Sequence, residues 1–188
     1  MIPYLIFLAA VGAQRIGELL VSRRHTRWSL ARGGIEVGRG HFLAMKALHA
    51  AFRVACALEA VWLHRPFVRW LGAPMLGLAL AAQALRLWSL RSLGERWNAR
   101  VIVVPGAPVV ARGPYRFVRH PNYLAVAVEA LAIPLVHGAW ITALTFSVLN
   151  AGLLTVRVRC EERALAAHCP DPAGIGRLPR FVPRMSRA

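Results

Sequence analysis

Two charge-rich segments carry the residue types that could do chemistry. Residues 112–129 read RGPYRFVRHPNYLAVAVE, and residues 157–165 read RVRCEERAL. In the first segment His120 directly precedes a proline at the expected start of a helix. Unpaired backbone N–H groups at such a start, with Arg116 and Arg119 close by, favour an anion. The first segment therefore predicts an anion site at a helix N-terminus.

The helix that follows carries further polar residues. Asn122 and Glu129 are seven residues apart, so they share one helix face. Tyr123 offers a ring with a polar tip, which could pack on a flat base. Glu129 lies about two turns inside an apolar helix, where a lone carboxylate is costly and marks a candidate site. We expect Arg157 or Arg159 to be its partner.

The second segment has the spacing of ion pairs along a helix. Arg157 and Glu161 are separated by four residues, and Arg159 and Glu162 by three, so both pairs could form. A solvated, salt-bridged helix would explain this spacing. Alternatively, these carboxylates could join the anion site around a zwitterionic ligand that also has a positive centre. S-adenosylmethionine is one such ligand, and the residues permit it without selecting it.

The composition indicates a membrane protein rather than a soluble domain. The chain is 57% hydrophobic with a mean hydropathy of +0.47. Its apolar runs of about 20 residues match the thickness of a hydrocarbon core. We predict a single-domain, all-α integral membrane bundle of about five helices, without a metal site because the three cysteines form no metal-binding motif. The predicted spans are about 2–21, 41–63, 71–90, 121–136 and 139–156, followed by a cytoplasmic segment at 157–188.

The arginines predict the orientation. The net charge is +16, and the positive side chains lie between the apolar runs rather than along one stripe. This distribution favours binding to anionic lipid head groups over binding to nucleic acid. The segments after successive helices hold five, two, six, zero and seven arginines, so 18 of 23 fall on one side. By the positive-inside rule that side is the cytoplasm and the N-terminus faces outward. Both charge-rich segments should therefore meet on the cytoplasmic face.

Several polar residues lie inside the predicted spans. Arg15 and Glu18 could pair, and they could either reach the membrane surface or face the bundle. In the second span Lys46, His49 and Arg53 form a stripe down one face. The stripe is explained by a partly wet helix or, alternatively, by a substrate cavity that it lines.

The connections complete the expected architecture. We expect a polar loop at residues 22–40 and a small β-like hairpin at VIVVPGAPVV, around its Pro-Gly pair. The fifth helix is expected to continue as a charged helix to His168. The loop at 94–120, the fourth helix and the C-terminal helix would then lie together.

Together these motifs resemble the isoprenylcysteine carboxyl methyltransferase family of integral membrane enzymes. The resemblance rests on GPYRFVRHPNYL, the embedded glutamate and RVRCEERAL. The segments QRIGELLVSRR and GGIEVGRGHF also look like a bacterial branch associated with type III polyketide synthases, whose members O-methylate alkylpyrones or alkylresorcinols. The resemblance implies a cytoplasm-facing S-adenosylmethionine pocket, formed by the loop at 94–120, the fourth helix and the C-terminal helix. The pocket would be capped by the C-terminal segment and open sideways to the bilayer for a lipophilic acceptor.

The resemblance also implies roles for single residues. The cofactor site falls on His120, Asn122, Tyr123 and Glu129, joined by Arg116 and Glu161. Arg157 and Glu162 match the family's catalytic arginine and glutamate. Arg157 would stabilise the acceptor's anion, and Glu162 would either orient Arg157 or accept a proton. Ala125 departs from the glycine that many members have. The tail HCPDPAGIGRLPRF lacks the family's tyrosine-rich spacing.

Two other functions compete with an S-adenosylmethionine-dependent O-methyltransferase. NADPH-dependent membrane reductases of the sterol or steroid type share a similar His-Pro-Asn-Tyr region, and a non-catalytic membrane scaffold would bind neither nucleotide. The short chain and its second motif favour the methyltransferase. The sequence does not distinguish between a polyketide, a prenylcysteine and another lipid as the lipophilic acceptor. We expect a bacterial inner-membrane location and functional coupling to a type III polyketide synthase.

Overall fold

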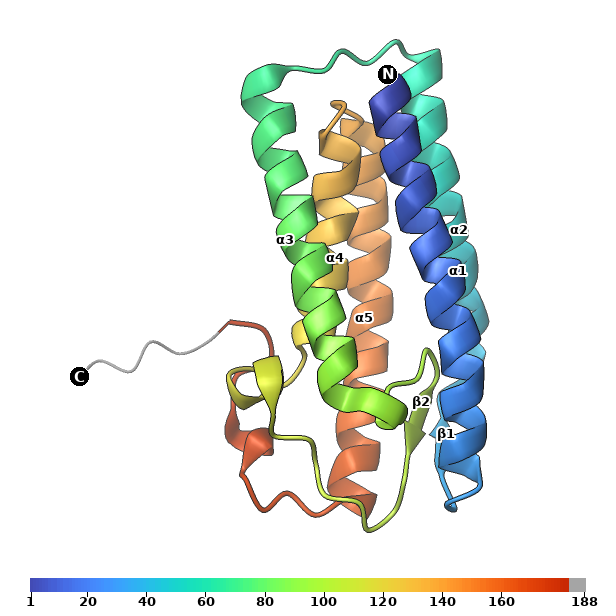
Figure 1. Ribbon diagram of the computed structural model, residues 1–188, viewed down its shortest axis with the longest axis vertical. Coiled ribbons are helices and arrows are strands. Elements are labelled where there is room, and N and C mark those ends of the chain that lie inside the picture. The colour runs from blue at the N-terminus through green and yellow to red at the C-terminus, as the bar shows by residue number, and fades with distance from the viewer. Residues whose placement is uncertain (183–188) are drawn as a thin grey trace, which may run out of the picture.

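The computed structural model describes residues 1–182, and in this part of the chain four long helices and one shorter helix run up and down beside one another (Figure 1). The helices are α1 (Ile2–Leu30), α2 (Arg39–Trp62), α3 (Arg69–Leu93), α4 (Pro121–Leu135) and α5 (Trp140–His168). α1, α2, α3 and α5 are long and apolar enough to cross a membrane. The prediction of an all-α membrane bundle is confirmed.

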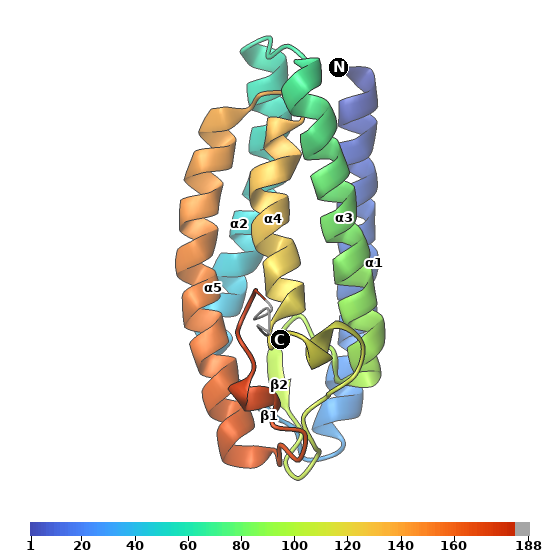
Figure 2. The ribbon, with the colours of Figure 1, turned by 90° about the vertical axis from the view of Figure 1, so that its left-hand side faces the viewer.

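α4 is the short helix of the bundle, and it lies among the others (Figure 2). Its 15 residues span about 22 Å, less than the roughly 30 Å hydrocarbon core. Its core-facing residues are small, with Ala125 and Ala132 fully buried, and this lets neighbouring helices approach closely. Tyr4 of α1 donates a hydrogen bond to the carbonyl oxygen of Ile133 at 3.1 Å, which attaches α1 to α4. These contacts place α4 at the centre of the bundle.

The short strands and 3-10 helices collect at one end of the bundle, opposite the N-terminus, which we call the polar end (Figures 1 and 2). They comprise strands β1 (Ile35–Val37) and β2 (Val101–Val103) and the short 3-10 helices η1 (Gly94–Arg96), η2 (Gly113–Arg116) and η3 (Ile175–Arg177). Both charge-rich segments therefore lie at the same end of the molecule.

Two expectations for the connections were wrong. Residues 22–30 extend α1 instead of forming a loop, because arginine is a good helix former and residues 22–32 contain no Gly or Pro. Gly33, with a φ of 74°, then ends the helix. The expected hairpin is absent from the described residues: β2 pairs antiparallel with β1, with Ile35 opposite Val103.

The Pro-Gly pair after β2 connects to α5 instead of turning back. The backbone N–H of Gly106 donates to the carbonyl oxygen of His168 at 2.9 Å, at the last turn of α5. α5 itself runs without a break from the apolar segment to His168, so its predicted charged extension is confirmed.

Candidate functional site

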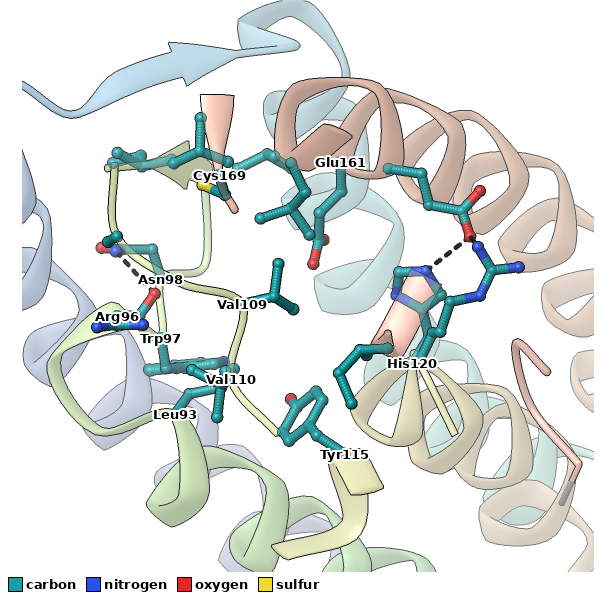
Figure 3. A pocket seen from close by; sticks show the side chains of 18 of the residues that line it. Leu93, Arg96, Trp97, Asn98, Val109, Val110, Tyr115, His120, Glu161 and Cys169 are labelled. Atoms are coloured by element: carbon teal, nitrogen blue, oxygen red, sulfur yellow. Dashed lines mark hydrogen bonds and ion pairs between the residues drawn. The ribbon is translucent and has the colours of Figure 1, made fainter. Parts of the chain in front are cut away.

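A cavity of about 600 Å³ lies at the polar end of the bundle (Figure 3). Its size falls in the ~300–1,000 Å³ range typical of small-molecule sites. The walls come from the 94–120 loop, the start of α4, the end of α5 and the tail, as the sequence predicted. Leu93, Val109, Val110 and Tyr115 give the cavity an apolar side, and His120 and Glu161 lie across it from Leu93 and Val110. Glu162 also lines the cavity. We call this space the first cavity.

Glu162 is held by three cationic or basic side chains. Arg119 Nη1 lies 2.9 Å and Arg180 Nη2 lies 2.7 Å from its carboxylate oxygens, and His120 Nε2 lies 3.1 Å away. The backbone N–H groups of Arg119 and His120 also donate to the carbonyl oxygens of Pro179 and Arg180, both at 3.0 Å. These bonds fasten the tail against the start of α4.

Arg157 reaches α4 and the loop through neutral partners. Its Nε donates to the hydroxyl of Tyr123 at 2.7 Å, and its Nη2 donates to the carbonyl oxygen of Ala99 at 2.6 Å. The Tyr123 hydroxyl donates in turn to Glu161. The third nitrogen, Nη1, is buried and has no partner among residues 1–182. Arg157 is 5% exposed, so a donor is left unsatisfied inside the protein.

Neither ion pair that the spacing allowed within the second segment forms among the described residues. Arg157 bonds Tyr123 rather than Glu161, and Glu162 binds partners from the residues just before α4 and from the tail rather than Arg159. Exposed pairs along a helix contribute only about 0.2–0.5 kcal/mol. Here α5 packs against α4 and the residues before it, so the buried Tyr123 and His120 and the partly buried Arg119 replace partners on the same helix.

The N-terminal helix positions the loop that meets Arg157. Ser22 Oγ accepts from the backbone N–H of Ala99 at 2.8 Å, and Thr26 donates to the side chain of Asn98 at 3.0 Å. Asn98 also donates to Ser29 Oγ at 3.2 Å. These serines and the threonine lie on the part of α1 that the sequence had assigned to a loop. The extension of α1 therefore fixes the carbonyl group that receives Arg157.

A second cavity, of about 250 Å³, lies deeper among α1, α2, α4 and α5. It is lined by the polar stripe of α2, Lys46, His49 and Arg53, so the stripe faces a cavity within the bundle. Five residues line both cavities, namely Trp97, Asn98, Asn122, Tyr123 and Arg157. The two spaces therefore adjoin at the Tyr123–Arg157 pair.

A buried ionic network joins α1, α3 and α4 beside the second cavity. Arg15 Nη2 lies 2.7 Å from Glu129, and Arg15 Nη1 lies 2.8 Å from Glu18. Arg86 Nη2 contacts Glu18 at 2.6 Å, and Arg86 Nη1 donates to Asn122 at 3.0 Å. The partner expected for Glu129 was wrong, because Arg15 takes the place of Arg157 or Arg159. Arg15 and Glu18 face the bundle rather than the membrane surface.

Most of the predicted site residues line the first cavity. These are His120, Asn122, Tyr123, Arg157, Glu161 and Glu162. Glu129 lines the second cavity instead, and it shares this space with Asn122. Arg116 lines neither cavity; its guanidinium lies 4.7 Å from the centre of the Phe117 ring. The roles assigned to these residues stay predictions.

Sequence reasoning did not assign Arg86, Trp97 or Asn98 to the site. Arg86 could have been found, because an ionisable residue inside an apolar span is a functional candidate by default. Trp97 and Asn98 lie in an irregular segment, and nothing in their spacing indicates which helix they would meet.

Two titratable groups in the wall of the first cavity stay protonated. Burial, reinforced by the negative charge of Glu161, raises the pKa of Tyr115. Burial also raises the pKa of Cys169, although the positive charge of Arg96 opposes this. The phenol and the thiol are therefore neutral at pH 7, and neither is poised as a nucleophile.

Comparisons with known proteins agree with this arrangement. The sequence model of the isoprenylcysteine carboxyl methyltransferase (ICMT) family matches residues 75–167, which include both charge-rich segments. The uncharacterized protein YpbQ of Bacillus subtilis is 37% identical over 161 residues, covering 85% of this chain and 95% of its own. An uncharacterized protein of Haemophilus influenzae is 28% identical over 164 residues, covering 86% of this chain and 94% of its own. The chain belongs to the isoprenylcysteine carboxyl methyltransferase family, a family of membrane methyltransferases.

Proposed function

We propose that the protein is an S-adenosylmethionine-dependent O-methyltransferase that acts at the membrane on a lipophilic acceptor. The observation that carries the proposal is the position of Arg157. It is buried between a cavity at the polar end and a cavity inside the bundle, and it has one unpartnered donor. A reaction between a soluble donor and a membrane-dissolved acceptor needs a residue that contacts both spaces.

The first cavity suits a zwitterion attached to a flat base. Glu161 offers a carboxylate for a positive centre, while Arg119 has a buried Nε without a partner in the described residues and offers a donor for a carboxylate. The apolar side, with Tyr115, offers a surface for a base. When bound there, S-adenosylmethionine would supply an electrophilic methyl group. The donor set fits this cofactor.

The residues around that cavity would bind the acceptor, stabilise its charge and exclude water. Arg157 would hold the acceptor's oxygen and stabilise its negative charge, and the Tyr123 hydroxyl would keep Arg157 in place. Glu162 would clamp the tail against α4 and so exclude water from the site. For Glu162 to accept a proton, as the resemblance implies, it would have to leave at least one of its three partners.

The acceptor would be an alkylpyrone- or alkylresorcinol-type polyketide or an isoprenylcysteine-like carboxylate. The resemblance of the N-terminal half to the polyketide-associated branch supports the first class and a functional coupling to a type III polyketide synthase. The polar end, which holds the arginine-rich segments after α3 and α5 and the arginine-rich end of α1, would face the cytoplasm of a bacterial inner membrane, with the N-terminus outward. That is the compartment in which S-adenosylmethionine is dissolved.

Calorimetry on the purified protein in uncharged detergent tests the proposal. S-adenosylhomocysteine should bind and NADPH should not. Methyl transfer from labelled S-adenosylmethionine should then occur with at least one acceptor among alkylpyrones, alkylresorcinols and prenylated cysteines. Arg157→Ala should abolish transfer while the protein still inserts and folds. Binding of NADPH alone would indicate a reductase, and binding of neither nucleotide would indicate a scaffold.

A further inference from the structure

The second cavity has an excess of positive charge. Seven charged side chains line it, five of them cationic and two anionic: Arg15, Lys46, Arg53, Arg86 and Arg157, with Glu18 and Glu129. The cavity lies among helices that cross the membrane, where charge is poorly solvated. The excess of positive over negative side chains in this cavity therefore needs a physical explanation.

Four of the seven neutralise one another. Arg15 contacts both Glu18 and Glu129, and Arg86 contacts Glu18, so two cations and two carboxylates form a closed network. These pairs are 2.6–2.8 Å long, and each of the four side chains is at most 13% exposed. The network leaves no carboxylate free for the other three cations.

Lys46, Arg53 and Arg157 form no ion pair within residues 1–182. Lys46 Nζ lies 5.7 Å from the centre of the Phe42 ring, and Arg157 bonds only neutral groups. Arg157 Nη1 is buried without a partner. An uncompensated cation inside a bundle is costly unless an anion occupies the same space. Arg157 is buried and Arg53 is partly buried, whereas Lys46 is exposed on α2. Two such cations inside the bundle, with Lys46 on the wall of the same cavity, indicate a negatively charged ligand.

The remaining walls indicate what carries that charge. Leu8, Phe52, Ile133, Phe146 and Leu154 line the same cavity with apolar surface. A small inorganic anion would leave this surface unfilled, whereas an amphiphile would use both parts. The arrangement fits an apolar chain that ends in an ionised head group.

We infer that Lys46 and Arg53 of α2, together with Arg157, form an anion subsite that selects methyl acceptors by the negative charge of their head group. The inference rests on the proposed function, in which the second cavity receives the acceptor. It makes α2, which lies outside both charge-rich segments, the element that determines specificity. Acceptors that are ionised at the working pH should be preferred over neutral ones with the same chain.

The subsite can be tested without any turnover. We would compare binding of decane sulfonate and decyltrimethylammonium, which have the same chain and opposite charge, to the purified protein in uncharged detergent. The sulfonate should bind and the ammonium should not. In a Lys46→Gln/Arg53→Gln double variant, sulfonate affinity should fall about tenfold or more, because two charge-assisted contacts are lost. Arg53→Lys, which keeps the charge, should retain most of the preference.

The matched control removes the same charge from exposed positions of α1. Arg23→Gln/Arg24→Gln should bind the sulfonate as the wild type does. Equal affinity in the α2 double variant and this control would overturn the inference. Phosphatidylglycerol titrated into the same sample identifies another source of the anion: should it bind and resist displacement by an acidic alkylpyrone, the site is a lipid site and the acceptor assignment fails.

A separate measurement keeps the two proposals apart. S-adenosylhomocysteine affinity should be unchanged in all of these variants, because Lys46 and Arg53 do not line the first cavity. A wild-type protein that fails to bind S-adenosylhomocysteine would overturn the methyltransferase proposal. The sulfonate comparison would still decide whether the cationic subsite exists.

Discussion

The buried ionic network should respond unequally to removal of Arg15 and removal of Glu129. Arg15 is the single cation that contacts Glu129 within the described residues, whereas Glu18 is shared by Arg15 and Arg86. Arg15→Gln therefore leaves Glu129 as an isolated buried carboxylate. Glu129→Gln leaves Arg15 paired with Glu18. The first substitution should destabilise the protein more than the second.

The expected sizes follow from burial. The side chains of Arg15 and Glu129 are 13% and 8% exposed, so their pair is largely dry. Removing one partner of such a pair costs about 3–5 kcal/mol when the other is left uncompensated. For a chain of this size a change of 1 kcal/mol shifts Tm by about 2–4 °C, so Arg15→Gln should lower Tm by roughly 6–20 °C. Glu129→Gln should cost about 1–3 kcal/mol, as expected for loss of a hydrogen bond to a charged group.

The assay is thermal unfolding in uncharged detergent, read from tryptophan fluorescence. Arg23→Gln serves as the control, because Arg23 is exposed on α1 and should shift Tm by less than about 2 °C. In the double variant Arg15→Gln/Glu129→Gln the isolated charge is gone, so its loss should be smaller than the sum of the single losses. Equal Tm values for the two single variants, or additivity in the double variant, would refute the assigned pairing.

Three further substitutions test separate parts of the structure. Arg157→Lys keeps the charge but loses the planar fork, so kcat should fall about 10²-fold with a nearly unchanged Tm. Glu162→Gln weakens the clamp on the tail, so proteolysis after Arg180 should speed up and S-adenosylhomocysteine should bind more weakly; an unchanged cleavage rate would contradict the clamp. Gly72→Ala places a Cβ 2.5 Å from the carbonyl oxygen at the C-cap of α4 and should lower Tm by about 2–12 °C, whereas Gly77→Ala on the same helix meets nothing within 4 Å and should not.

The bundle could be predicted because its signals are local. Apolar runs show the spans, and the proline after His120 marks the start of α4. The continuation of α5 follows from residues 157–168, which contain no Gly or Pro and are rich in Arg, Glu, Ala and Leu. The β1–β2 pair could not be predicted, because two three-residue strands more than 60 positions apart have no shared turn and no periodicity.

The partners inside the site were harder to predict than its members. Sequence spacing reveals only neighbours along one helix, and so it allowed a pair between Arg157 and Glu161. In the fold a tyrosine hydroxyl on α4 stands between them. The pairing of Arg15 with Glu129 joins residues 114 positions apart, which requires knowing that α1 packs beside α4. Residue types therefore identified the site, and only the packing of helices showed the contacts.

The depth of Arg157 connects the fold to the proposed reaction. It is the first residue after the apolar span predicted at 139–156, on a helix that continues for three more turns as a charged segment. A residue at this position lies near the level of the lipid head groups when the apolar span fills the hydrocarbon core. An amphiphilic acceptor already holds its polar head at that level and its chain below it. On the proposed function, the acceptor would enter the second cavity by lateral movement without being lifted out of the bilayer, and the cations of α2 would replace the water that solvates its head.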